Sequence, residues 1–175
     1  MSRKKRQSRL SYYQRSASGE YIYTGSYMTY VEEGRSRRRL LTELWCMGAG
    51  ALVCLLAGGF LPVESFTGCG YVLFPYMLAL LASIAVLWQL GELTGGGEPI
   101  KTYVYEAAVP RIPRLSMLSV LGAVLCILGQ IVRCVMNGGC TIGEILFLLL
   151  EAAGAALLLL FRRSIRRAHW RLAGD

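Results

Sequence analysis

Four apolar stretches, each long enough to cross a lipid bilayer, constrain this chain more than any other feature. They occupy residues 40–61, 71–90, 115–136 and 142–161. A transmembrane α-helix needs about 20 apolar residues, each rising about 1.5 Å along the helix axis. A soluble chain of 175 residues could not bury four such stretches, and the charged residues, 17% of the total, lie almost entirely outside them. We therefore predict an all-α membrane protein in which residues 40–161 form a bundle of four transmembrane helices.

The positions of the basic residues predict how the bundle is oriented. Of the 19 Lys and Arg residues, ten precede the first apolar stretch, five follow the fourth, and three lie in the connection 91–114. The connections 62–70 and 137–141 contain none. Because loops rich in Lys and Arg stay in the cytoplasm, we expect both termini to be cytoplasmic. The pattern of four spans resembles the many small four-helix proteins of bacterial membranes in architecture, so we expect a multi-pass protein of a bacterial cell (plasma) membrane.

The formal net charge of +8 fits two kinds of anionic partner, nucleic acid and lipid headgroups. The basic residues flank the apolar stretches, so we expect contact with the anionic headgroups of the bilayer and no nucleic-acid binding. The residues expected to contact headgroups are Arg37, Arg38, Arg39, Arg162, Arg163, Arg166 and Arg167.

Two terminal segments outside the bundle are expected to differ in structure. Residues 1–19 are rich in Arg, Lys and Ser and lack an apolar period, which predicts a disordered basic arm. Residues 162–175 carry a basic stripe beside an apolar face. We expect them to continue the fourth helix as a basic amphipathic tail on anionic lipid.

A tyrosine-rich cytoplasmic segment occupies residues 20–39. Its tyrosines on either side of the turn-like Thr24–Ser26 are Tyr21, Tyr23, Tyr27 and Tyr30. This pattern predicts a small cytoplasmic β-hairpin, which would need a partner surface because isolated hairpins are marginal. Residues 101–105 would supply a third strand, or else an interfacial helix that ends before Pro110. The segment is either a docking module or an aromatic belt at the level of the headgroups.

Each connection on the outer side of the predicted bundle contains one cysteine. A disulfide between Cys69 and Cys140 would tie the two helical hairpins together in an oxidising exterior. Two free thiols are the alternative, and Cys134 at the end of the third stretch competes for either partner.

Polar residues inside the third and fourth stretches form the candidate site. Glu151 lies about ten residues into the fourth stretch, where an ionised carboxylate costs at least ~3 kcal/mol. Glu144 precedes it by seven residues, so both point to one helix face. If that face looks into the bundle, Arg133 lies at the depth of Glu144 and Gln130 nearer to Glu151. Glu151 then serves as a proton or cation site, as a protonated carboxyl that bonds between helices, or as the partner of a basic residue in another subunit.

No nucleotide-binding loop, HExxH, GxSxG or metal-ligand cluster occurs in the sequence, so we expect neither catalysis nor a cofactor nor a metal. We predict a non-catalytic membrane protein, an accessory or scaffold subunit that acts through its cytoplasmic side and helix faces. It would bind a membrane-protein partner or form a homo-oligomer. The alternative is a small oligomeric transporter or channel that uses Glu151 as its proton or cation site.

Overall fold

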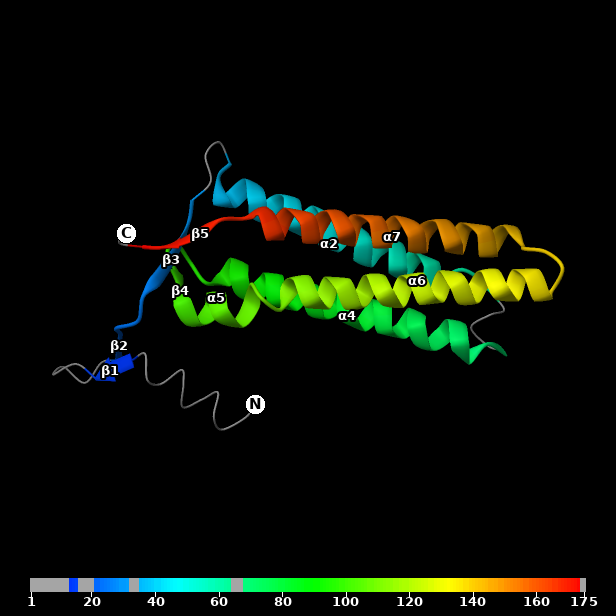
Figure 1. Cartoon of the computed structure of the whole chain (residues 1–175), viewed down its shortest axis with the longest axis horizontal. Coiled ribbons are helices and arrows are strands. Elements are labelled where there is room, and N and C mark those ends of the chain that lie inside the picture. Colours follow the sequence, from blue (N-terminus) through cyan, green and yellow to red (C-terminus); the bar gives the residue numbers. More distant parts are fainter. Residues whose placement is uncertain (1–12, 16–20, 32–34, 64–67, 174–175) are drawn as a thin grey trace.

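The computed structural model contains four long helices that lie side by side (Figure 1). They are α2 (Arg37–Gly59), α4 (Gly70–Gly95), α6 (Ile112–Met136) and α7 (Ile142–Arg167). The structure describes residues 13–15, 21–31, 35–63 and 68–173. Each of the four is long and apolar enough to cross a membrane, which confirms the predicted membrane-spanning helices. α4 and α7 continue five or six residues beyond the predicted stretches, to Gly95 and Arg167.

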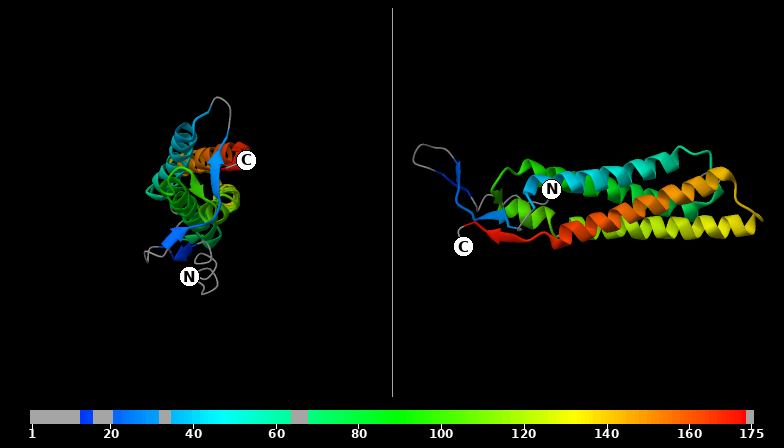
Figure 2. Two further views of the ribbon diagram at one scale, coloured as in Figure 1. Left: turned by 90° about the vertical axis from the view of Figure 1, so that its left-hand side faces the viewer. Right: turned by 90° about the horizontal axis from the view of Figure 1, so that it is seen from above.

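The helices form a closed ring in which every neighbour runs in the opposite direction. α2 packs against α4 and α7, and α6 packs against the same two helices from the other side. The view along the bundle shows the four helices grouped around one axis (Figure 2). Such an up-down-up-down arrangement suits short connections between successive helices.

The character of the bundle core changes along its length. At one end the buried side chains are large, among them Leu40, Leu44, Leu90, Ile112 and Phe161. The middle is filled by small residues that include Ala79, Ala123 and Ala155. Small side chains let helices in lipid approach closely, so that van der Waals contact and polar bonds hold them together.

The closest approach is between α4 and α6, at Gly122. A Cβ atom on Gly122 would lie 2.8 Å from the backbone nitrogen of Ala79 and 2.9 Å from the carbonyl oxygen of Pro75. Three residues before it, Ser119 Oγ donates to the carbonyl oxygen of Ala79 at 2.8 Å, and its hydroxyl also bonds to Ser83 Oγ at 2.7 Å. Backbone contact and hydrogen bonds together fix this pair of helices.

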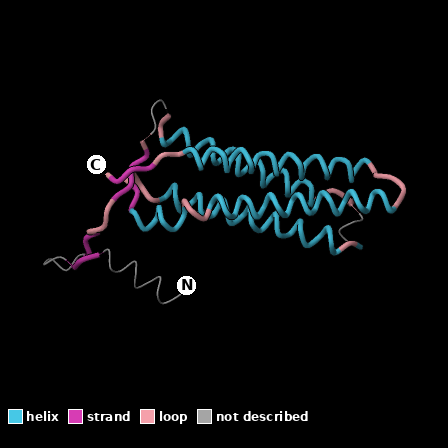
Figure 3. The backbone as a smooth tube through the Cα atoms, in the orientation of Figure 1, coloured by secondary structure: helices cyan, strands magenta, loops and turns pink. Residues whose placement is uncertain are grey.

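A three-stranded antiparallel sheet closes one end of the bundle (Figure 3). The central strand β3 (Tyr27–Tyr30) lies between β4 (Ile100–Lys101) and β5 (Trp170–Leu172). The segment before the bundle, the connection between α4 and α6, and the segment after the bundle therefore meet in one sheet. We call this the sheet end, and the opposite end, with the α2–α4 and α6–α7 connections, the far end.

The predicted hairpin is wrong in its pairing, although two strands lie where it was expected. β2 (Tyr21–Tyr23) pairs back with β1 (Tyr13–Arg15), while β3 pairs with β4 and β5. Short strands are marginal alone, and β3 gains hydrogen-bonded neighbours on both edges in this way. The predicted disordered arm at residues 1–19 lies outside the described residues, except for β1.

Both alternatives for residues 101–105 occur, one after the other. Lys101 ends strand β4, and the next seven residues form the helix α5 (Thr102–Ala108). Thr102 joins the sheet to this helix, since its backbone N–H donates to the carbonyl oxygen of Ser26 at 3.1 Å.

The tail is helical only as far as Arg167, which corrects the predicted amphipathic helix beyond it. The backbone becomes extended at Ala168, and strand β5 begins two residues later. The Trp170 ring packs against Tyr30 and Tyr105, with centroids 5.4 Å and 5.8 Å away. Burial of the indole against these rings and pairing with β3 offset the helical hydrogen bonds that are lost.

Candidate functional site

The polar site in the interior of the bundle begins at the first turn of α7. Thr141 caps this helix: its Oγ1 accepts from the backbone N–H of Glu144 at 3.3 Å. In return, Glu144 Oε2 accepts from the backbone N–H of Thr141 at 2.8 Å. This capping box satisfies two backbone donors and holds the Glu144 side chain in one place.

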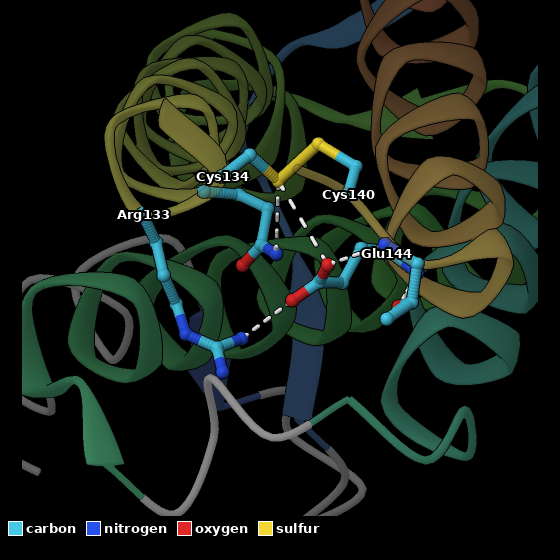
Figure 4. A network of polar contacts seen from close by, with 6 residues as sticks. Arg133, Cys134, Cys140 and Glu144 are labelled. Carbon is cyan, nitrogen blue, oxygen red and sulfur yellow. Dashed lines mark hydrogen bonds and ion pairs between the residues drawn. A yellow bond between two sulfur atoms is a disulfide. The ribbon is translucent and has the colours of Figure 1, made fainter. Parts of the chain in front are cut away.

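Arg133 of α6 reaches the same carboxylate. Its Nη1 donates to Glu144 Oε1 at 2.6 Å, and 9% and 8% of the two side chains are exposed (Figure 4). The structure thus brings together three of the four residues predicted to form the intramembrane site, because the Gln130 side chain also lies close enough to interact with the Glu144 carboxylate. Arg133 also lies in the last turn of α6, where a cation is favoured by the helix dipole.

A disulfide lies beside this ion pair, and it corrects the predicted bridge. Cys140 is bonded to Cys134, not to Cys69, which is a free thiol. The reason is the turn after α6, where Gly138 has φ 74° and the chain reverses. The reversal brings the Cα atoms of Cys134 and Cys140 to 5.1 Å, within the range a disulfide requires.

Glu151, two turns further along α7, differs from Glu144 in its hydrogen bonding. It is 0% exposed, and neither carboxyl oxygen has a hydrogen-bond partner in the described part of the chain. Tyr76 of α4 and Cys126 of α6 are close enough to interact with it electrostatically. A Cβ atom on Gly58 of α2 would lie 3.9 Å from its Oε1. Residues from all four helices therefore surround this carboxyl group.

The neighbours of Glu151 do not solvate it. The hydroxyl of Tyr76 donates to the carbonyl oxygen of Leu55 at 3.0 Å. Gln130, which was predicted to lie nearer to Glu151, is also fully buried. Its Nε2 lies 3.9 Å from Cys134 Sγ, and its side chain is close enough to Glu144 to interact with that carboxylate. Its Oε1, like the Glu151 oxygens, lacks a hydrogen-bond partner among the described residues. An unpaired ion in such surroundings is costly, so a bound proton and a bound cation are the two states this carboxyl can use.

No protein family, curated protein or solved structure matches this chain. Its function is therefore argued from its own residues.

The arginines predicted to contact lipid headgroups all lie near the sheet end. Arg37 donates to the carbonyl oxygen of Leu93 at 3.1 Å, and Arg162 lies 3.4 Å from the sulfur of Met117. Arg39 is paired with Glu43 at 3.3 Å. The exposed members of the set are Arg38, Arg39, Arg163, Arg166 and Arg167.

Two contributors were missed at the sequence level. Tyr76 carries the only hydroxyphenyl group in the middle of α4 and bonds to α2, and a tyrosine inside an apolar stretch is itself a signal that its hydroxyl has a partner. Arg35 forms an ion pair with Glu43 and donates to Ser164 Oγ of α7 at 3.0 Å. Because Ser164 lies 129 residues further along the chain, no local pattern predicts that bond.

Proposed function

We propose that this protein is a non-catalytic accessory or scaffold subunit of a bacterial plasma membrane, with its sheet end in the cytoplasm. The distribution of charge supports the orientation. The two far-end connections carry no Lys or Arg, and the nearest basic side chain, Arg133, is paired inside the bundle. Basic residues concentrate at the sheet end, which is the pattern of cytoplasmic loops.

The sheet itself is the observation that carries the proposed role. Its three strands come from residues 27–30, 100–101 and 170–172, so the chain builds a folded surface from three distant segments on one side of the bundle. A protein that needed only to span the membrane would not require this structure. Within the described residues, its outer strands β4 and β5 each have one edge without a paired strand, and such edges accept a further strand from a partner.

The surface beside the sheet is aromatic as well. Tyr23 packs edge-on against Tyr27 and Tyr103, with ring centroids 5.1 Å and 6.0 Å apart. Lys101 Nζ lies 5.3 Å from the centroid of the Tyr23 ring. Tyrosine is enriched in protein interfaces because it offers a large rigid surface and a polar group. Contact with a partner protein is therefore the role that this end fits best.

The test is purification from native membranes in mild detergent, followed by mass spectrometry of the intact particle. We compare the full chain with a variant lacking residues 1–23, which removes β1 and β2 but keeps β3. A variant lacking residues 1–12 is the matched control, because it keeps all five strands. We expect a stoichiometric partner with the full chain and the control, and its loss from the longer deletion. A homo-oligomer without a partner would refute the accessory role. A partner that the longer deletion retains would show that β1, β2 and Tyr23 do not bind it and would leave the edges of the three-stranded sheet as the contact.

A second candidate function rests on Glu151. Its carboxyl group is fully buried in the bundle and has no hydrogen-bond partner among the residues that the structure describes, which is the arrangement expected of an intramembrane proton or cation site. Under this alternative the chain forms an oligomeric transporter or channel, and Glu151→Gln abolishes proton or cation flux into liposomes. The double variant Arg133→Met, Glu144→Gln is the control, since it removes the other buried carboxylate together with its partner and leaves no unpaired charge. Wild-type flux no higher than that of empty liposomes would reject the transport function.

A further inference from the structure

A basic groove lies between the first turns of α2 and the last turns of α7, near the sheet end. Its volume is about 610 Å³, and its mouth is lined by four arginines. These are Arg35, Arg39, Arg163 and Arg167. Two come from the entry into α2 and two from the end of α7, so the groove exists only because the two helices pack together.

The arginines are held in place to different degrees. Arg35 is fixed by its ion pair with Glu43 and by its bond to Ser164 Oγ at 3.0 Å. Arg39 Nε lies 3.3 Å from the same Glu43 carboxylate. Arg163 and Arg167 form no ion pair with another described residue. Four positive charges therefore face one negative charge among the lining residues, which gives the groove a net charge of about +3. Arg35 and Arg39 are held by Glu43 before any ligand binds, and Arg163 and Arg167 have no competing carboxylate among the described residues.

The groove changes from basic to apolar along its length. Met47 of α2 and Leu160 of α7 line it together with the arginines. Met47 follows Arg39 by eight residues, which places it about 12 Å further along the helix axis. Leu160 lies one turn before Ser164, on the same side of α7. The order from the mouth inward is thus guanidinium groups, then a thioether and a leucine side chain.

We propose that this groove binds one anionic phospholipid. The arginines at its mouth hold the lipid phosphate, with Ser164 as a further polar contact, and one acyl chain runs along Met47 and Leu160. Guanidinium groups bind phosphate oxygens through paired N–H donors, and a basic pocket between transmembrane helices at the membrane surface is a known form of headgroup site. A free phosphate would use the mouth alone and leave the apolar part of the groove unexplained. The site does not depend on the proposed partner or on which side of the membrane the sheet end lies.

This proposal differs from diffuse attraction of a basic surface to lipid. Diffuse attraction depends on how many charges lie near the membrane, so each arginine contributes about equally. A groove site depends on which arginines line it. Arg162 and Arg166 of α7 share an adjacent hollow with Arg163 and Arg167, so the comparison is made with Arg38 and Arg114, exposed arginines that line neither hollow.

The experiment is native mass spectrometry of the detergent-purified full chain titrated with phosphatidylglycerol or with phosphatidylcholine of the same acyl chains. The groove variant is Arg163→Gln with Arg167→Gln. The control is Arg38→Gln with Arg114→Gln, which removes the same charge from two exposed arginines that line neither the groove nor the adjacent hollow. We expect one phosphatidylglycerol per chain for wild type and control, and a loss of roughly tenfold or more in affinity for the groove variant. Equal losses in both variants, or equal binding of phosphatidylcholine, would overturn the proposal.

Two further measurements separate a lipid from a free anion and from misfolding. Leu160→Trp fills the apolar part of the groove without changing its charge, and we expect it to weaken phosphatidylglycerol binding. Inorganic phosphate should not displace the lipid from the wild-type protein. A lipid affinity unchanged by Leu160→Trp, or ready displacement by inorganic phosphate, would show that the arginines bind a free anion and that no lipid site exists.

Discussion

The guanidinium of Arg133 bonds to the carboxylate of Glu144 across 2.6 Å, at a place where less than a tenth of either side chain is exposed. Seven residues further along α7, Glu151 is equally buried and has no hydrogen-bond partner in the described part of the chain. Two carboxylates on one helix face are thus in opposite situations. The first fastens α6 to α7 at the far end, and the second is available for a proton or a cation.

Arg133→Met should destabilise the protein by about 3–5 kcal/mol, because it leaves the Glu144 charge buried and unpaired. The double variant Arg133→Met, Glu144→Gln should recover most of this loss, since glutamine is neutral and its side-chain oxygen can still accept from Thr141. Urea unfolding in mild detergent measures both. If the single and double variants unfolded at the same urea concentration, the ion pair would have no stabilising role.

Gly122→Ala should lower stability by about 1–3 kcal/mol, the usual cost of overpacking. The added Cβ would lie 2.8 Å from the backbone nitrogen of Ala79, and a backbone atom cannot move aside without shifting α4. Gly91→Ala on α4 is the control, because nothing lies within 4 Å of that position and alanine favours helix. The melting temperature should fall for the first variant alone, and equal melting temperatures would contradict the close helix contact.

The Cys134–Cys140 disulfide predicts which thiols react. Unfolding without reductant, followed by alkylation and peptide mass spectrometry, should label Cys69 and leave Cys134 and Cys140 unlabelled. Cys140→Ser should cost about 2 kcal/mol through the loss of this short loop, whereas Cys69→Ser should change little. Labelled Cys140 together with protected Cys69 would contradict the assignment.

Trp170→Ala should loosen β5 from the sheet. The indole packs on Tyr30 and Tyr105, and aromatic pairs of this kind contribute about 0.5–1.5 kcal/mol each beyond their burial. Hydrogen exchange should accelerate at the amides of residues 28–30 and 170–172 and remain unchanged in the bundle. Trp88→Ala serves as control, because that side chain is 71% exposed. Unchanged exchange in the sheet would show that Trp170 does not hold it together.

The four spanning helices were predictable because the length and apolar character of each stretch decide them locally. The shared helix face of Glu144 and Glu151 followed from their seven-residue spacing, whereas the inward direction of that face was only a condition of the prediction and is shown by their burial. The nearness of Arg133 to Glu144 followed from the antiparallel course of α6 and α7 across a short connection. Each of these inferences needs only one helix or two consecutive ones.

The sheet and the disulfide were not predictable on the same basis. β3 takes its neighbours from residues 100–101 and 170–172, and no local pattern ranks such distant partners above an adjacent strand. The disulfide depended on the turn at Gly138, whose positive φ returns Cys140 to the last turn of α6. The arginine groove was not predicted because it also depends on distant segments: Arg35 and Arg163 come together only when α2 packs against α7.

The measurement that tests the central claim most directly is the side of the membrane on which the sheet end lies. Green fluorescent protein and alkaline phosphatase are each fused after Asp175, and each is also fused to the chain truncated after Gly139. The first reporter is fluorescent only in the cytoplasm and the second is active only outside it. We expect fluorescence without phosphatase activity at Asp175, and the reverse at Gly139. Phosphatase activity at Asp175 would place the sheet and its arginines outside the cell and contradict the proposed cytoplasmic role.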